Sequence, residues 1–241
     1  MLKPWKKDSS DTTFNEFYTL PENAEKIFRP IRPFFMDKKI HCPCDDENSA
    51  IVQWLQQNTN STITFSHLPE HDMNGDYARE MMLKSDLVVT NPPFKMSEWK
   101  PFFLWLVDNK IDYFIFGPIC GNRALYSLMD RIYYPKKVNT CFFYALPDGR
   151  LAPATTIFYT SLPVPVNDYE YKVPKKEITY FDGIPVFDKT VNIPKDYFGW
   201  MYVPCTAIRR LDLHNFEFDE KDRGVPGKFN RLKIRRLRPD G

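Results

Sequence analysis

Four consecutive residues, Asn91-Pro92-Pro93-Phe94, combine an amide, two ring-constrained residues and an aromatic ring. Proline fixes its φ angle, so two prolines in succession leave the Asn91 side chain and the nearby carbonyl groups little freedom to reorient. An amide oxygen and a backbone carbonyl held in this way can accept hydrogen bonds from an exocyclic amino group, and a ring beside them can stack on the base that carries it. The tetrapeptide is therefore a candidate site for chemistry on a base.

The same tetrapeptide has an ordinary structural explanation. The run LVVT at 87–90 is β-branched and predicts a strand, and prolines end strands because they have no N–H to donate. Asn before Pro starts turns, and Phe94 could belong to the core. The place of the turn favours the functional interpretation, because open α/β sheets bind ligands beyond the carboxyl ends of their strands.

Two further polar turns, CPCDDENSA at 42–50 and NGDYARE at 74–80, are expected at the ends of neighbouring strands. With the first turn they would form a crevice lined by Asp45, Asp46, Asp76, Asn91 and Phe94. Such carboxylates suit the hydroxyl and amino groups of a cofactor that carries ribose and adenine. Helix capping remains the alternative for Asp45 and Asp46, and an ordinary turn for Asp76.

The elements that position these turns alternate between strand and helix. Strands are expected within KKIHC, STITFSHL, LVVT and DYFIFGPI, and helices after Pro21, around 50–57, within 77–84 and from a Ser97 cap onward. That alternation predicts a mostly parallel sheet with helices on both faces. After Tyr134 the pattern changes to strands with little helix. We expect these to be antiparallel strands that finish the sheet and then give way to a small irregular C-terminal lobe.

Composition sets the outer limits of this interpretation. The 241 residues, 43% hydrophobic, are enough for one α/β domain with a modest accessory lobe, and no run approaches the roughly 18 apolar residues of a membrane span. The N-terminus lacks a signal-like apolar stretch, so a cytoplasmic location is the expectation. The five cysteines are odd in number and scattered, and the CPC spacing is not that of a zinc knuckle, so neither disulfides nor a metal site is expected.

The net charge of +2 does not by itself identify a nucleic-acid partner. The basic residues gather at the end of the chain, where residues 221–241 carry eight Lys/Arg against two Asp. A solvated tail, an arm that contacts phosphates, and an edge strand with a basic outer face all fit this segment.

The sequence resembles the EcoRI-type family of adenine-specific DNA methyltransferases. Asn91–Phe94 is a form of the (Asp/Asn/Ser)-Pro-Pro-(Tyr/Phe/Trp) signature of enzymes that methylate exocyclic amino nitrogens. Many methyltransferases have a Gly-rich loop after the first strand, whereas this family, like this chain, has a Cys-Asp-Asp run there. The resemblance spans roughly residues 15–218 and includes NEFYT, CPCDD, GDYARE, DLVVTNPPF, FGPICGNRA, ATTIFYTSL and IPKDYFGWMYVPCTAIRRLDLHNFEF.

The resemblance implies a Rossmann-like class I methyltransferase that uses S-adenosylmethionine and acts on N6 of a flipped adenine in double-stranded DNA. Asn91, Pro92, Pro93 and Phe94 would hold the target base. The residues implied in cofactor binding are Tyr18, Thr19, Cys44, Asp45, Asp46 and Asp76. A restriction–modification setting, with a cognate endonuclease as candidate partner, is also implied, whereas the recognition sequence does not carry over, since CGNRALY at 120–126 and YALPDGR at 144–150 stand where target-recognition loops would lie.

The expected division of the chain is a methyltransferase core at 1–165 and a lobe at 166–241 whose basic tail contacts DNA. Three alternatives stay open at this point. RNA or a protein amide could be the methyl acceptor, because base flipping, phosphate contacts and the Asn-Pro-Pro turn are compatible with each. A catalytically silent relative that still binds DNA is the third, because the first loop has no glycine.

Overall fold

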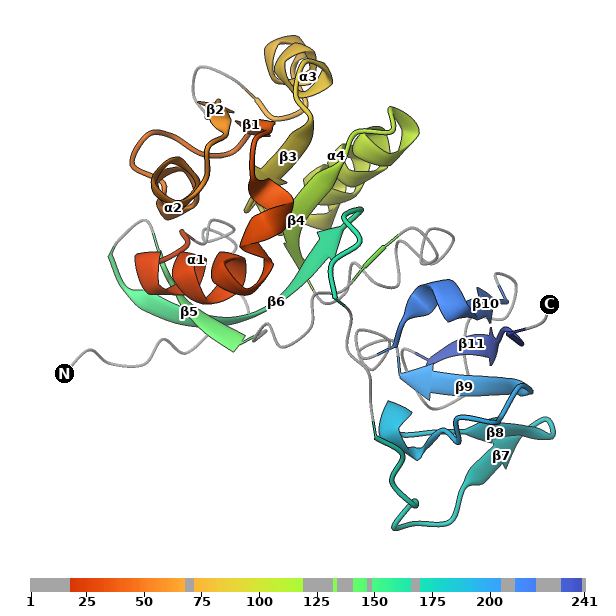
Figure 1. Ribbon diagram of the computed structural model, residues 1–241. Helices are drawn as coiled ribbons and strands as arrows, with labels where there is room; N and C mark the ends of the chain where they lie inside the picture. The colour runs from red at the N-terminus through yellow and green to blue at the C-terminus, as the bar shows by residue number, and fades with distance from the viewer. Residues whose placement is uncertain are drawn as a thin grey trace. The chain divides into compact units, whose positions relative to one another are not determined.

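The computed structural model describes residues 18–67, 72–118, 132–133, 141–146, 149–165, 170–204, 211–219 and 231–239 (Figure 1). The chain forms two compact units. The first comprises Met1–Ile119 with Lys137–Pro163, and the second comprises Cys120–Lys136 with Val164–Gly241. In the described part of the chain, no helix is both long and apolar enough to cross a membrane. The expected loop CGNRALY lies outside the described residues, as do residues 221–230, 240 and 241 of the basic tail.

The first unit is an α/β structure, as the sequence predicts. Its elements are α1 (Pro21–Phe28), the 3-10 helix η1 (Arg29–Phe35), β1 (Lys39–Cys42), α2 (Ala50–Asn58), β2 (Thr62–Phe65), α3 (Asp76–Leu83), β3 (Leu87–Thr90), α4 (Met96–Asp108), β4 (Tyr113–Pro118), β5 (Cys141–Ala145) and β6 (Leu151–Thr160). The strand order is β2-β1-β3-β4-β6-β5. The sheet is mixed: β2, β1, β3 and β4 pair in parallel, whereas β6 runs antiparallel to both β4 and β5.

Helices cover both faces of this sheet, as the contacts of Tyr113 and Phe114 in β4 show. The Phe114 ring lies 5.5 Å from that of Phe28 in α1, while the Tyr113 ring lies 5.0 Å from that of Phe103 in α4. Neighbouring side chains of a strand point to opposite faces, so α1 and α4 must lie on opposite sides (Figure 1). α2 joins the α1 side, where Trp54 packs 5.3 Å from Phe28.

Helix α4 packs against the sheet through Trp99, which is fully buried. Its indole Nε1 donates to the carbonyl of Phe116 at 2.8 Å, and its ring contacts that of Tyr159 at 5.0 Å. Gly117 makes this approach possible, because a Cβ atom there would lie 2.5 Å from the Trp99 ring. The predicted Ser97 cap is wrong: α4 begins at Met96, and its N-cap residue, Lys95, makes no side-chain capping bond.

The second unit contains a five-stranded sheet, so the prediction of an irregular lobe is wrong for its described residues. Its elements are β7 (Thr179–Phe181), β8 (Ile184–Val186), the 3-10 helix η3 (Thr190–Asn192), β9 (Trp200–Pro204), the 3-10 helix η5 (Leu213–Asn215), β10 (Phe216–Phe218) and β11 (Arg231–Arg236), and the strand order is β10-β11-β9-β8-β7. β11 carries the alternating basic and apolar residues of the tail. It lies between β10 and β9, so it is not the edge strand that its composition suggests.

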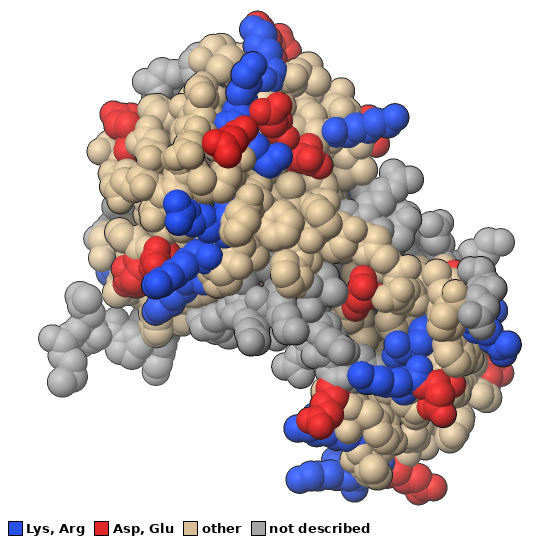
Figure 2. All heavy atoms as spheres, in the orientation of Figure 1, with Lys and Arg blue, Asp and Glu red and all other residues tan. Residues whose placement is uncertain are grey.

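Three basic residues of β11 are paired with acids of the same unit. Arg231 Nη2 lies 2.5 Å from Asp188, and Lys233 Nζ lies 3.0 Å from Asp219. Arg235 forms an ion pair with Glu217 of β10. The side chains of Arg231 and Lys233 are only 10% and 16% exposed, so these two cations are built into the sheet. Figure 2 shows basic and acidic side chains beside one another on the face in view.

Candidate functional site

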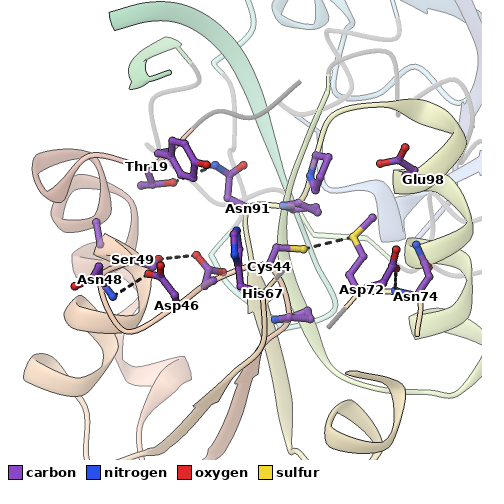
Figure 3. A pocket seen from close by; sticks show the side chains of 17 residues that line it. Thr19, Cys44, Asp46, Asn48, Ser49, His67, Asp72, Asn74, Asn91 and Glu98 are labelled. Carbon is purple, nitrogen blue, oxygen red and sulfur yellow. Dashed lines mark hydrogen bonds between the residues drawn. The ribbon is translucent and has the colours of Figure 1, made fainter. Parts of the chain in front are cut away.

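A pocket of about 400 Å³ opens in the first unit at the carboxyl ends of β1, β2 and β3 (Figure 3). The turn after β1 and the Asn-Pro-Pro turn after β3 form two of its walls. The lining residues are Tyr18, Thr19, Pro43, Cys44, Asp45, Asp46, Asn48, Ser49, Ala50, His67, Asp72, Met73, Asn74, Asn91, Pro92, Pro93 and Glu98. The crevice that the sequence predicts at this edge of the sheet therefore exists.

The pocket brings together most of the predicted site residues. Those that line it are Tyr18, Thr19, Cys44, Asp45, Asp46, Asn91, Pro92 and Pro93. Two predicted residues, Asp76 and Phe94, are not among the lining residues. Asp76 is exposed as the first residue of α3, and Phe94 is partly buried just beyond Pro93.

Several polar lining residues were not predicted from the sequence, namely Asn48, Ser49, His67, Asp72, Asn74 and Glu98. Asp72 and Asn74 belong to the turn before α3, where the Asx pattern D-M-N-G carries a signal: Asp72 Oδ1 accepts from the Asn74 N–H at 2.6 Å. Glu98 follows the Asn-Pro-Pro turn in the first turn of α4, and no local pattern separates it from a surface glutamate.

Asp45 is buried between the two walls, with only 7% of the residue exposed. Its Oδ1 accepts from Ser49 Oγ at 2.5 Å, and its Oδ2 accepts from Thr90 Oγ1 at 3.0 Å. Burial disfavours the charged form and raises the Asp45 pKa to about 6, although the two hydroxyl bonds and His67 oppose the shift. Burial likewise raises the pKa of the Cys44 thiol, so this sulfur is not a ready nucleophile.

The first loop keeps its shape without glycine. The Asn48 N–H donates to Asp46 Oδ1 at 2.9 Å, and Ser49 caps α2 by accepting from the Ile51 N–H at 3.2 Å. Residues 43–49 are all described, and every one has a negative φ, because the positive-φ positions lie elsewhere. Glycine is needed where φ is positive or where the backbone must approach a neighbour closely. Side-chain hydrogen bonds shape this loop instead.

Asn91 is held by a hydrogen bond to the segment that precedes α1. Its Nδ2 donates to Thr19 Oγ1 at 3.2 Å, and the amide oxygen therefore points to the other side of the group (Figure 3). The neighbouring Tyr18 forms a two-way backbone bridge with Ala145 of β5, at 2.9 and 3.0 Å. Tyr18 and Thr19 thus connect the segment before α1 to β5 and to the turn after β3.

The lining of the pocket is acidic. Asp45, Asp46, Asp72 and Glu98 contribute carboxyl groups, whereas no Lys or Arg is among the lining residues. Lys95, which is not among the lining residues, pairs with Glu98, and its Nζ lies 2.5 Å from the Glu98 carboxylate. A pocket with this balance attracts ligands that carry positive charge or hydrogen-bond donors.

The variant Asp45→Asn should remove a pH dependence of stability. The Asp45 pKa rises from 3.8 to about 6 on folding. Between pH 3.8 and about pH 6, the Asp45 carboxyl group is therefore protonated in the folded state but ionised in the unfolded state. The free energy of unfolding therefore falls as pH rises through this window, by on the order of 3 kcal/mol from this group, and the loss is complete above pH 6. Urea titrations at pH 4 and pH 7 would measure it. Equal losses in wild type and variant would contradict the prediction.

No protein-family model matches the chain. Three known proteins are similar to it over most of its length. The Type II methyltransferase M.EcoRI of Escherichia coli is 23% identical over 97% of this chain and 95% of its own length. M.MgeORF184P of Mycoplasma genitalium and M.MpnI of Mycoplasma pneumoniae, also Type II methyltransferases, are each 25% identical over 84% of this chain and 81% of theirs. Over most of its length the chain is therefore similar to Type II methyltransferases of the EcoRI type.

Proposed function

We propose that the protein is an adenine-specific DNA methyltransferase, which transfers a methyl group from S-adenosylmethionine to the N6 amino nitrogen of a flipped adenine. The observation that carries this proposal is one pocket in which the Asn91-Pro-Pro turn faces an acidic loop. Similarity to three Type II methyltransferases supports it, and so does the amide of Asn91, which suits an amino group as substrate.

The pocket fits S-adenosylmethionine in size and in chemistry. Its volume of about 400 Å³ lies in the usual range of ligand pockets, roughly 300–1,000 Å³. The carboxyl groups of Asp46 and Asp72 suit the ribose hydroxyls and the cationic amino and sulfonium groups of the cofactor. When bound, S-adenosylmethionine supplies an electrophilic methyl group. Tyr18, Thr19, Cys44 and Asp76 belong to the same proposal as cofactor-binding residues.

We also propose that the first unit is a Rossmann-like methyltransferase core. Its parallel strands in the order β2-β1-β3-β4 place the pocket beyond their carboxyl ends, as open α/β sheets do. In terms of residue ranges, the core would comprise 1–165, a range that also includes Cys120–Lys136 of the second unit. Residues 166–241 would form the lobe that contacts double-stranded DNA. A restriction endonuclease of the same system and a cytoplasmic location complete the proposal.

Asn91 and Pro92 would prepare the target amine. The lone pair of an exocyclic amino nitrogen is delocalised into the ring, so this nitrogen is a poor nucleophile. Hydrogen bonds from its two hydrogens to Asn91 Oδ1 and the Pro92 carbonyl would favour a tetrahedral nitrogen with an available lone pair. Pro93 limits the movement of the turn, so the base is held in line for attack on the methyl group.

The variant Phe94→Ala should weaken capture of the flipped base. Flipping the adenine out of the duplex costs a few kcal/mol, and stacking of the flipped base on Phe94 would offset about 1–3 kcal/mol of that cost. We expect the KM for DNA to rise about tenfold, while the Kd for S-adenosylmethionine stays close to wild type. Phe143→Ala is a matched control, because Phe143 is 58% exposed on β5. Unchanged kinetics on DNA for Phe94→Ala would count against stacking.

The experiment that tests the function is transfer of labelled methyl from S-adenosylmethionine to unmethylated DNA, with RNA and protein run alongside. Digestion of labelled DNA to nucleosides would identify N6-methyladenine. Label in RNA or in a protein amide instead would replace DNA as the substrate. Salt-sensitive DNA binding without transfer and without a cofactor-dependent thermal shift would identify a silent relative.

A further inference from the structure

The hydrogen bond between Thr90 and Asp45 joins the two walls of the pocket. Thr90 is the last residue of β3, is fully buried, and directly precedes Asn91. Its Oγ1 donates to Asp45 Oδ2 at 3.0 Å across 45 positions of sequence. The turn that carries the amide is thereby tied to the loop after β1.

Asp45 is also tied to the start of α2. Ser49 donates to the second carboxylate oxygen at 2.5 Å, and the same hydroxyl caps the helix through Ile51 N. The backbone pairing of β1 with β3 extends to His41 and Val88 in the described residues. Beyond His41 and Val88, the segments that follow β1 and β3 are joined by side-chain hydrogen bonds, which run from Ser49 at the start of α2 through Asp45 to Thr90.

We propose that Asp45 is a positioning residue, which sets the Asn91–Pro93 turn relative to the loop at 43–49 through Thr90, and does not itself hold the cofactor. This inference rests on the proposed function, within which it reassigns one residue of the cofactor pocket. Each oxygen of Asp45 already accepts a hydroxyl hydrogen, and the residue is 7% exposed. Asp46 and Asp72, which are less buried, are left to meet the ligand.

The consequence for the reaction is geometric. Methyl transfer requires the amine nitrogen, which Asn91 would hold, to lie in line with a methyl group held by the first loop. A displacement of about 1 Å can cost about 100-fold in rate. Losing the Thr90 bond should therefore lower kcat, while cofactor affinity, which depends on groups within the loop, changes little.

The test compares Thr90→Val, which keeps the shape of the side chain but not its hydroxyl, with Thr90→Ser, which keeps the hydroxyl. Thr160→Val is the matched control, because Thr160 is a buried threonine of β6 whose Oγ1 donates to the Tyr113 carbonyl at 2.6 Å. We expect Thr90→Val to lower kcat about 10- to 100-fold. Thr90→Ser and Thr160→Val should stay within about threefold of wild type, and the calorimetric Kd for S-adenosylmethionine should change less than threefold in all three.

A double variant and hydrogen exchange test whether Thr90 acts through Asp45. If the two form one unit, Asp45→Asn combined with Thr90→Val should lower kcat no further than the worse single change. Amides at 46–50 should also exchange faster in Thr90→Val than in Thr160→Val. Wild-type kcat in Thr90→Val, or a large rise in the cofactor Kd with kcat unchanged, would overturn the proposal.

The exchange measurement separates this proposal from the proposed function. If the wild-type protein transferred no methyl group, the proposed function would be wrong. Hydrogen exchange at 46–50 would still show whether the Thr90–Asp45 hydrogen bond holds the loop at 43–49. Unchanged exchange there in Thr90→Val would overturn the positioning role with or without activity.

Discussion

Asn91→Ala should lower methyl transfer by at least about 100-fold and leave the fold intact. Loss of one preorganised hydrogen-bonding group that acts at a reacting centre commonly costs 100- to 1,000-fold in rate. Asn91 lies beyond the end of β3 and is partly exposed, outside the apolar core, so the free energy of unfolding should change little. Single-turnover transfer to DNA and urea titration would measure the two effects.

Two companion variants sharpen this prediction. Asn91→Asp keeps an oxygen acceptor in place and is allowed by the family signature, so it should retain more activity than Asn91→Ala. Asn109→Ala removes an asparagine that caps the far end of α4, where its Nδ2 donates to the Trp105 carbonyl, and it should keep wild-type transfer. Wild-type turnover in Asn91→Ala would show that the site is assigned wrongly.

Trp99→Ala should lower the free energy of unfolding of the first unit by about 3–5 kcal/mol, as aromatic truncations in cores do. The change removes a fully buried ring that stacks on Phe103 at 5.3 Å. It also removes the donor to the Phe116 carbonyl and leaves a cavity opposite Gly117, which has no side chain to fill it. Hydrogen exchange of the β4 amides would report on this unit alone.

The matched control is Trp105→Ala on the same helix. Trp105 is only partly buried and packs under Arg79, whose guanidinium lies 5.4 Å from the ring. Its removal should cost about 1 kcal/mol, chiefly the cation–π contact and part of the apolar burial. Equal destabilisation by the two changes would contradict the idea that Trp99 and Gly117 form the contact between α4 and the sheet.

Local patterns determined much of the first unit. Short runs of apolar, aromatic and β-branched residues predicted β1 to β4, and apolar spacing predicted the helices between them, because each pattern reports a single strand or helix. The Asn-Pro-Pro turn could be placed at a strand end for the same reason. Parallel strands that end in polar turns then predicted a crevice, and three of the five residues named for it, Asp45, Asp46 and Asn91, line the pocket. Tyr18, Thr19 and Cys44 also line it, but they were named only because of the family resemblance.

The partners of those residues were decided only by the tertiary structure. Thr90 and Asp45 are 45 positions apart and Asn91 and Thr19 are 72 apart, and no local period connects them. The same holds for β11, whose Arg231 and Lys233 pair with acids of other segments. The sequence predicted that antiparallel strands finish the sheet, but the position of β6 between β4 and β5 came only from the structure. The sequence alone identified candidate side chains for the proposed chemistry, because residue type and strand ends are local properties. Which of them face the pocket and which hold its walls together depends on contacts between distant segments, and those form only when the sheet assembles.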